Sequence, residues 1–278
     1  MVKVIDIDAL FDNYISDYVY KNIGKIKPEE IEDNIPKLYE EFGKKELKEL
    51  DGFSPETYYE NYTTAELLMC LKSHIEKGVS VPDFLCEALN KRKKDENEFI
   101  KLLEQTKNDE FLVYLMNILF DMDIVPVNIY VEFIVLNYPE TISELATEFL
   151  CKRADEAKDL ILSQFDQVDE GKKEMFCEVL SYCKKDDKVF NILIVQFAKN
   201  KNRTQLYSSY LARFGDERAL PFLLKATEEP KISYADFEEL RYAIEALGGV
   251  CDKTRDFSND KSFKIIKSSD KKNWLMLE

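Results

Sequence analysis

Apolar residues recur at intervals of three and four along most of the chain, in runs that short polar segments separate. Such intervals place the apolar side chains on one face of an α-helix. In the second half of the chain the runs fall near 108–121, 125–137, 141–153, 156–167, 171–183, 187–199, 203–214, 217–228 and 233–247. Their connections, two to five residues long, are typical of consecutive helices that pack as neighbours. The pattern predicts an all-α protein.

Residues that begin and end helices support this interpretation. Thr63 with Glu66, and again Thr141 with Glu144, have the spacing of a capping box, in which the two side chains accept the first free N–H groups of a helix. Glycine and proline number only 8 each, whereas a β-rich fold of this size needs many such turn residues.

One apolar position repeats near the end of a helix through the second half of the chain. Leu119 recurs as Leu150, Leu180, Leu211 and Ile244, at intervals of 31, 30, 31 and 33 residues. A period of this size indicates helix pairs that stack side by side and share one continuous core. The sequence therefore predicts an α-solenoid.

Three regions differ in how well they follow this period. We expect an irregular helical N-terminal part over 1–106, the repeats over 107–250, and a C-terminal cap or tail over 251–278. The segments SFKIIKSS and NWLMLE in the last region fit short strands, a final cap or a tail equally well. We also expect a monomer, because the two end regions would cap the repeats.

The segment LARFGDERALPFLLKATEE (211–229) resembles the end of the first helix, the turn and the second helix of a HEAT repeat. It is more closely similar to the short HEAT-like repeats of the phycobilin-lyase type. In ELRYAIEALGG (239–249), Ile244 and Gly248 correspond to Leu211 and Gly215. Residues 203–249 carry the clearest likeness. The matching residues of the first segment are Leu211, Phe214, Gly215, Asp216, Ala219, Leu220, Pro221, Leu223 and Leu224.

The resemblance implies a fold rather than one function. It implies a right-handed α-solenoid, HEAT- or armadillo-like, in which the second helix of each pair lines a concave binding surface. Upstream the chain departs from the pattern, since Lys184 and Ala154 stand where Gly215 stands in the best-matching unit.

The charge of the chain restricts its partners. The formal net charge is −15 and the sequence pI is near 4.8. Nucleic acids and anionic membranes attract basic proteins, so this charge disfavours both and suits another protein, a basic one included. Six cysteines without the spacing of a disulfide framework, and an N-terminus without a signal-peptide pattern, favour a cytoplasmic protein.

Residues with catalytic potential are few. The one histidine, His74, would have to serve any Ser–His–Asp or Cys–His system, and we interpret it as an ordinary, partly exposed residue near a helix end. Asp6 and Asp8 end an apolar run and superficially resemble the DxD of haloacid-dehalogenase phosphotransferases. The small residues that follow in that family are missing, so an acidic helix cap explains them better. We expect no catalytic residue, no metal and no cofactor.

Alignment of the repeats gives four candidate binding residues. Asn191, Arg218, Phe222 and Lys225 fall on exposed positions of second helices, although each could instead pack on a neighbouring repeat. A large exposed aromatic such as Phe222 suits a contact surface. We therefore expect a non-catalytic protein–protein interaction adaptor. The alternatives are an acidic inhibitory or immunity protein that blocks a basic partner, and a HEAT-type enzyme such as a tetrapyrrole lyase.

Overall fold

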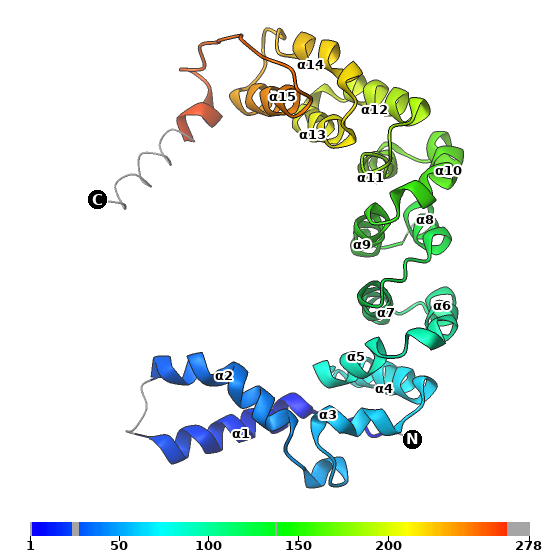
Figure 1. The fold of residues 1–278 in the computed structure, drawn as a ribbon, viewed down its shortest axis with the longest axis vertical. Helices are drawn as coiled ribbons and strands as arrows, with labels where there is room; N and C mark the ends of the chain where they lie inside the picture. Colours follow the sequence, from blue (N-terminus) through cyan, green and yellow to red (C-terminus); the bar gives the residue numbers. More distant parts are fainter. Residues whose placement is uncertain (1, 24–27, 137, 266–278) are drawn as a thin grey trace. The chain divides into compact units, whose positions relative to one another are not determined.

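The computed structural model describes residues 2–23, 28–136 and 138–265, which form helices and turns and no β-strand (Figure 1). The prediction of an all-α protein is confirmed. The chain divides into two compact units, unit 1 (Met1–Ile129) and unit 2 (Tyr130–Glu278). The region boundary near residue 106 came from repeat spacing and stays a prediction.

Unit 1 combines an N-terminal helix hairpin with a more densely packed group of helices. α1 and α2 contact each other along the hairpin, α4, α5 and α7 pack together, and α6 packs on α7. Leu67, Leu85 and Leu112 are among the fully buried side chains of this group. The helices are α1 (Ile7–Asn22), α2 (Pro28–Gly43), α3 (Pro55–Tyr58), α4 (Thr64–Lys77), α5 (Asp83–Asn90), α6 (Glu96–Gln105) and α7 (Asp109–Asp121).

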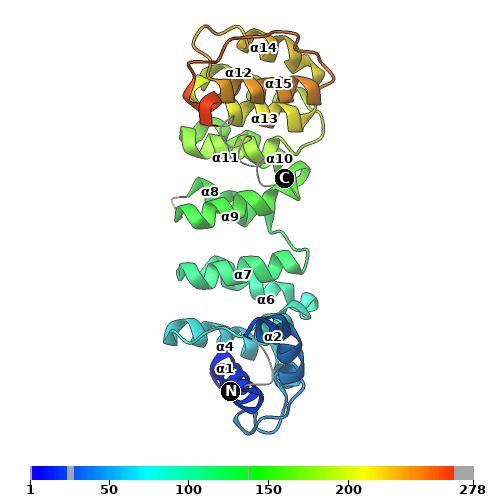
Figure 2. The same ribbon diagram turned by 90° about the vertical axis from the view of Figure 1, so that its left-hand side faces the viewer.

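Unit 2 holds its helices in two rows (Figures 1 and 2). In one row α9, α11, α13 and α15 each contact the next, while α10, α12 and α14 pack against this row. The unit boundary lies inside α8 (Val127–Val135). The helices that follow are α9 (Glu140–Cys151), α10 (Ala154–Gln164), α11 (Glu170–Leu180), α12 (Asp187–Lys199), α13 (Thr204–Phe214), α14 (Leu220–Ala226) and α15 (Tyr234–Ala246).

The repeated apolar position belongs to the core. Its five members are all buried, and they lie on α7, α9, α11, α13 and α15. The helix pairs are grouped differently from our expectation, however. In unit 2 the consecutive helices that pack most closely are α10 with α11, α12 with α13 and α14 with α15, rather than the pairs joined by the turn after each repeated leucine. A period defines the length of a repeat but not the turn at which it begins.

The second helices also lie on the opposite side from the one that the resemblance implied. Figure 1 shows that unit 2 curves towards the row of α9, α11, α13 and α15, so that α10, α12 and α14 lie on its outer side. The expectation that α12 and α14 line a concave surface is therefore wrong within this unit.

Polar contacts between neighbouring turns follow the same period in both units. In unit 1 the Lys91 ammonium lies 3.5 Å from Glu60, and the Asn90 amide donates to Asp121 at 3.2 Å, both at a separation of 31 residues. In unit 2 Arg203 donates to Glu174 at 2.5 Å, across 29 residues. The spacing seen in the apolar pattern thus has a polar counterpart, which begins near residue 60.

Helix ends show which local predictions hold. The Thr63–Glu66 capping box is confirmed, since each residue's backbone N–H donates to the other's side chain. The predicted box at Thr141 is wrong. α9 begins at Glu140, before Thr141, and its N-cap residue, Pro139, provides no side-chain cap. Pro139 takes the N-cap position with a ψ of 144°, so the helical conformation begins at Glu140 and Thr141 already lies in the first turn of α9.

The C-terminal region is described as far as Ile265. Arg255 donates to the carbonyls of Thr227, Glu229 and Pro230, and residues 261–265 are helical. The strand reading of SFKIIKSS is wrong for its described part, whereas NWLMLE lies outside the described residues. None of the helices in the described ranges combines the length and the apolar character that crossing a bilayer requires.

Candidate functional site: a lysine-rimmed apolar pocket

The four candidate residues are all exposed, but they do not form one site. Asn191 lies on α12, Arg218 in the 3₁₀ turn Glu217–Ala219, and Phe222 and Lys225 on α14. Phe222 and Lys225 are three residues apart and share one face of α14, while Leu223 between them is fully buried. Their contact with a partner stays a prediction.

Phe222 and Lys225 line a pocket of about 400 Å³ in unit 2. Its walls come from the end of α12, the start of α13, α14, the loop before α15 and the first turn of α15. The lining residues are Phe197, Ala198, Lys201, Thr204, Phe222, Lys225, Ala226, Glu229, Lys231, Ile232 and Asp236. The outer row of helices therefore carries a hollow large enough for one sizeable side chain.

The apolar part of the pocket combines buried and exposed side chains. Phe197 is buried, and Ile232 is half-buried on the loop before α15. Phe222 keeps 44% of its surface exposed beside them. An exposed phenylalanine next to a hollow of this size offers apolar area that an entering side chain can cover.

The rim of the pocket carries charge of both signs, but only part of it is paired. Lys201 and Glu229 form an ion pair of 2.5 Å. Asp236 accepts hydrogen bonds from Gln205 and Ser233, 2.8 and 2.7 Å long. Lys225 and Lys231 have no ion pair within 4.0 Å in the described part of the chain. Two ammonium groups on the rim are thus available to an entering carboxylate.

The rim is locally basic, because it carries three lysines, Lys201, Lys225 and Lys231, against the two carboxylates of Glu229 and Asp236. The hydrogen bond from Lys201, with the nearby charge of Lys225, lowers the pKa of Glu229 below its usual range. This pocket is a local exception in a chain of net charge −15.

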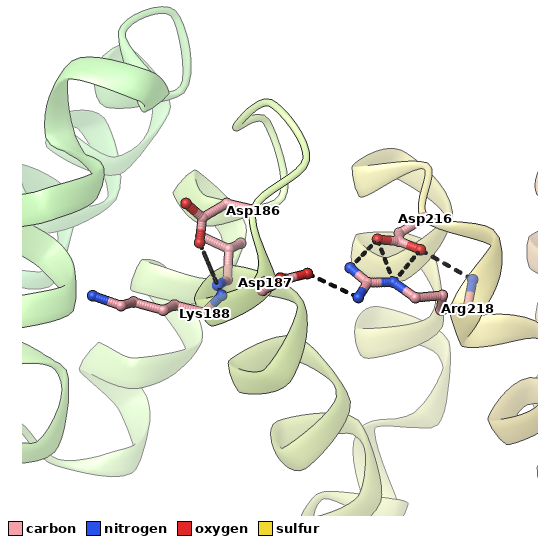
Figure 3. A network of polar contacts seen from close by, with 6 residues as sticks. Asp186, Asp187, Lys188, Asp216 and Arg218 are labelled. Atoms are coloured by element: carbon pink, nitrogen blue, oxygen red, sulfur yellow. Dashed lines mark hydrogen bonds and ion pairs between the residues drawn. The ribbon is translucent and has the colours of Figure 1, made fainter.

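Arg218 makes structural contacts within unit 2 (Figure 3). Its Nε and Nη2 atoms donate to the carboxylate of Asp216 at 3.0 and 2.6 Å, and Nη1 donates to Asp187 on α12 at 2.8 Å. The guanidinium also lies 4.3 Å from the ring centroid of Phe190. Arg218 therefore joins the turn before α14 to the start of α12.

Asp216 is the residue that this contact stabilises. Its side chain is buried, and its hydrogen bonds from the Arg218 guanidinium and backbone hold the pKa of the carboxyl below its ordinary value. Asp216 and Arg218 are close neighbours in the segment GDERAL, so their contact could be expected from the sequence. The contact of Arg218 with Asp187 on α12 could not.

Asn191 lies apart from the pocket. It borders a second hollow between α10 and α12, together with Asp159, Leu162, Ser163, Lys188 and Ile192. The structure therefore brings Phe222 and Lys225 together and leaves Asn191 and Arg218 outside.

Sequence reasoning missed the other pocket residues for an identifiable reason. Phe197 lies inside the predicted run 187–199, whereas Lys201 and Ile232 fall in the short segments between predicted runs. Their common site arises because the end of α12 meets a loop more than thirty residues later. The only available signal was the period itself, which places Lys201 opposite Glu229, 28 residues on.

Other reactive groups have structural surroundings. His74 is fully buried, and its Nδ1 lies 2.7 Å from the Ser80 carbonyl oxygen, so the expectation of a partly exposed histidine is wrong. The physical reason is the turn at Gly78, where the Val79 N–H bonds back to the His74 carbonyl and the chain covers the ring. Burial lowers the pKa of His74.

The aspartates of the N-terminal DxD and the cysteines have similarly ordinary surroundings. Asp6 caps α1 by accepting the Ala9 N–H at 2.8 Å, as the helix-cap interpretation predicted. Burial raises the pKa of both Cys70 and Cys86 to about 11, which disfavours the reactive thiolate. Within the described ranges, histidine, cysteine and acidic side chains form no group suited to a metal ion.

Comparison of the chain with protein-family models, with curated proteins and with solved structures gave no match.

Proposed function

We propose that the chain is a protein-binding adaptor whose helices stack as a right-handed α-solenoid of HEAT-like repeats. Two features support the solenoid. Each unit has polar contacts at separations near the apolar period, and unit 2 arranges its helices in two rows. Repeat proteins of this kind present extended surfaces that bind other proteins.

The pocket beside Phe222 carries the proposal for binding. A partner protein would insert one apolar side chain against Phe197, Phe222 and Ile232. Such an anchor contributes much of the free energy of an interface, because it removes apolar surface from water in a confined hollow. Lys225 and Lys231 favour a carboxylate close to this anchor in the partner.

Quantitative affinity purification from the native host, at moderate salt, tests this function. The bait is the full chain, and the variant is Phe222→Ser. The matched control is Val195→Ser on α12, which removes an equally exposed apolar side chain outside the pocket. We expect at least one protein whose recovery falls about tenfold with Phe222→Ser, equivalent to one good anchor, and is unchanged with Val195→Ser.

Two results would count against the adaptor. One is that no protein depends on Phe222 for its recovery. The other is turnover of a small substrate by the purified chain, which would favour the enzyme alternative. Recovery of a strongly basic partner that depends on salt but not on Phe222 would instead favour the inhibitory alternative.

A further inference from the structure

The outer half of the α1–α2 hairpin leaves its apolar side chains half-buried or exposed. We call residues 15–23 and 29–36 the distal hairpin. None of these residues is buried, and Tyr20, Ile23 and Ile35 are 78%, 68% and 38% exposed. The large apolar residues of the distal hairpin are Ile15, Tyr18, Val19, Tyr20, Ile23, Ile31 and Ile35.

The inner half of the same hairpin is anchored in unit 1. The rings of Phe11 and Phe42 have centroids 5.2 Å apart, and Tyr39 stacks on Phe84 of α5, also at 5.2 Å. Figure 1 shows α1 and α2 reaching away from α3–α7 beyond this anchor. Among the residues that the structure describes, each apolar stripe of the distal hairpin is therefore covered only by the other helix of the pair.

A third helix is the simplest structure that covers such a pair. The stripes recur at helical intervals, as Ile15 and Val19 on α1, continued by Ile23 directly after it, and as Ile31 and Ile35 on α2. Two helices in contact shield one side of each stripe, and an amphipathic helix laid along them shields the other. The occupant that fits this surface is thus a helix with one apolar face.

The charge around this surface indicates which residues flank the apolar face of the docking helix. α1 has three aspartates and one lysine, and α2 has six acidic residues and one lysine, so together they contribute −7 of the net charge of −15. Lys37 and Glu41 form an ion pair of 3.9 Å, whereas Asp12, Glu32 and Asp33 have none within 4.0 Å among the described residues. Basic residues beside the apolar face would pair with these carboxylates.

We propose that the distal hairpin is the docking site for a basic amphipathic helix of a partner protein, which completes a three-helix bundle with α1 and α2. This site is separate from the pocket beside Phe222 and depends on none of its residues. It gives the chain a second binding surface of opposite charge preference.

A model peptide tests the proposal on the full chain. The probe is a fluorescent amphipathic helix of leucine and lysine about 18 residues long, and its scrambled form has the same composition without an apolar face. Binding is followed by fluorescence anisotropy. We expect the amphipathic peptide to bind more tightly than the scrambled one, and hydrogen exchange to slow in α1 and α2.

Two variants remove the proposed contacts. Tyr20→Ser/Ile23→Ser/Ile35→Ser removes exposed apolar groups, and Glu29→Lys/Glu32→Lys/Asp33→Lys reverses charge. Each is expected to weaken Kd about tenfold, and the effect of the charge variant should shrink at about 0.5 M salt. Ile23→Ser alone gives a second variant with a smaller loss if the triple variant fails to fold.

Matched controls carry the same changes elsewhere. Met69→Ser/Val195→Ser/Val250→Ser removes exposed apolar groups, and Glu144→Lys/Glu148→Lys/Glu245→Lys gives the same net charge. Both should leave Kd unchanged. Equal losses in the controls, equal binding of the scrambled peptide, or protection outside α1 and α2 would overturn the proposal. So would a dimer of the chain that dissociates in the hairpin variants, because the occupant would then be a second copy.

Discussion

The helices α13 and α1 both carry apolar residues at helical intervals, but their surroundings are very different. In α13, Tyr207, Leu211 and Phe214 are all buried, because α12 and α15 both pack against it. In α1 only Ile7 is buried, at the first position, and the residues after it are half-buried or exposed, with α2 as the main helix that packs on them in the described part of the chain. The comparison shows that burial of a stripe depends on how many helices meet it, which neighbouring sequence does not reveal.

The largest expected effect comes from truncating the core of the better-packed region. Leu211→Ala should lower the free energy of unfolding by about 3 kcal/mol, because the surroundings cannot collapse around a fully buried leucine. Val19→Ala in α1 should cost about 1 kcal/mol or less. Urea denaturation followed by circular dichroism measures both, and equal losses would break the comparison.

Helix positions were accessible from sequence because their determinants are local. α7 and α12 begin and end within one residue of the predicted runs, and α4 ends at Gly78 in a left-handed conformation. The burial of His74 and the membership of the pocket were not accessible. They depend on which turns fold back and on side chains that meet only after the helices stack.

Gly249, which follows α15, provides a sharper test of the packing in unit 2. A Cβ at Gly249 would lie 2.6 Å from Leu220 Cδ2 and 2.9 Å from Ile244 Cγ2, so Gly249→Ala should cost about 1–3 kcal/mol by overpacking. Gly171→Ala is the matched control, because its Cβ meets only Asp169 at an ordinary 3.4 Å and alanine favours a helix. Thermal unfolding measures the stability of the two variants. A Gly249→Ala variant as stable as wild type would show that the packing around Gly249 is as loose as that of the α1–α2 hairpin.

The smallest expected effect concerns the turn before α14. Asp216→Ala should cost about 1 kcal/mol near neutral pH, because the carboxylate accepts the Arg218 N–H at the helix start. Since the folded-state pKa of Asp216 is lowered, its contribution is fully present above the ordinary carboxyl pKa and is lost as the pH falls through the folded value. The difference from wild type should therefore shrink in acid.

Denaturant titrations at about pH 7 and about pH 3 measure this change. Asp216→Asn is the control, because its amide oxygen still accepts the Arg218 N–H but the group cannot titrate. A difference between wild type and Asp216→Ala that stays constant from neutral to acid pH would show that the charge of Asp216 contributes nothing to unit 2.

The polar contacts at one period also determine which changes of length the chain tolerates. Arg203 contacts Glu174 and Lys91 contacts Glu60 across nearly the same number of residues, 29 and 31. Insertion or loss of a whole period would present each side chain with an equivalent neighbour, whereas a shift by a few residues inside a helix would separate donors from acceptors in every turn beyond it. The α-solenoid that we propose would therefore tolerate a change of length by a whole period better than a change by a few residues.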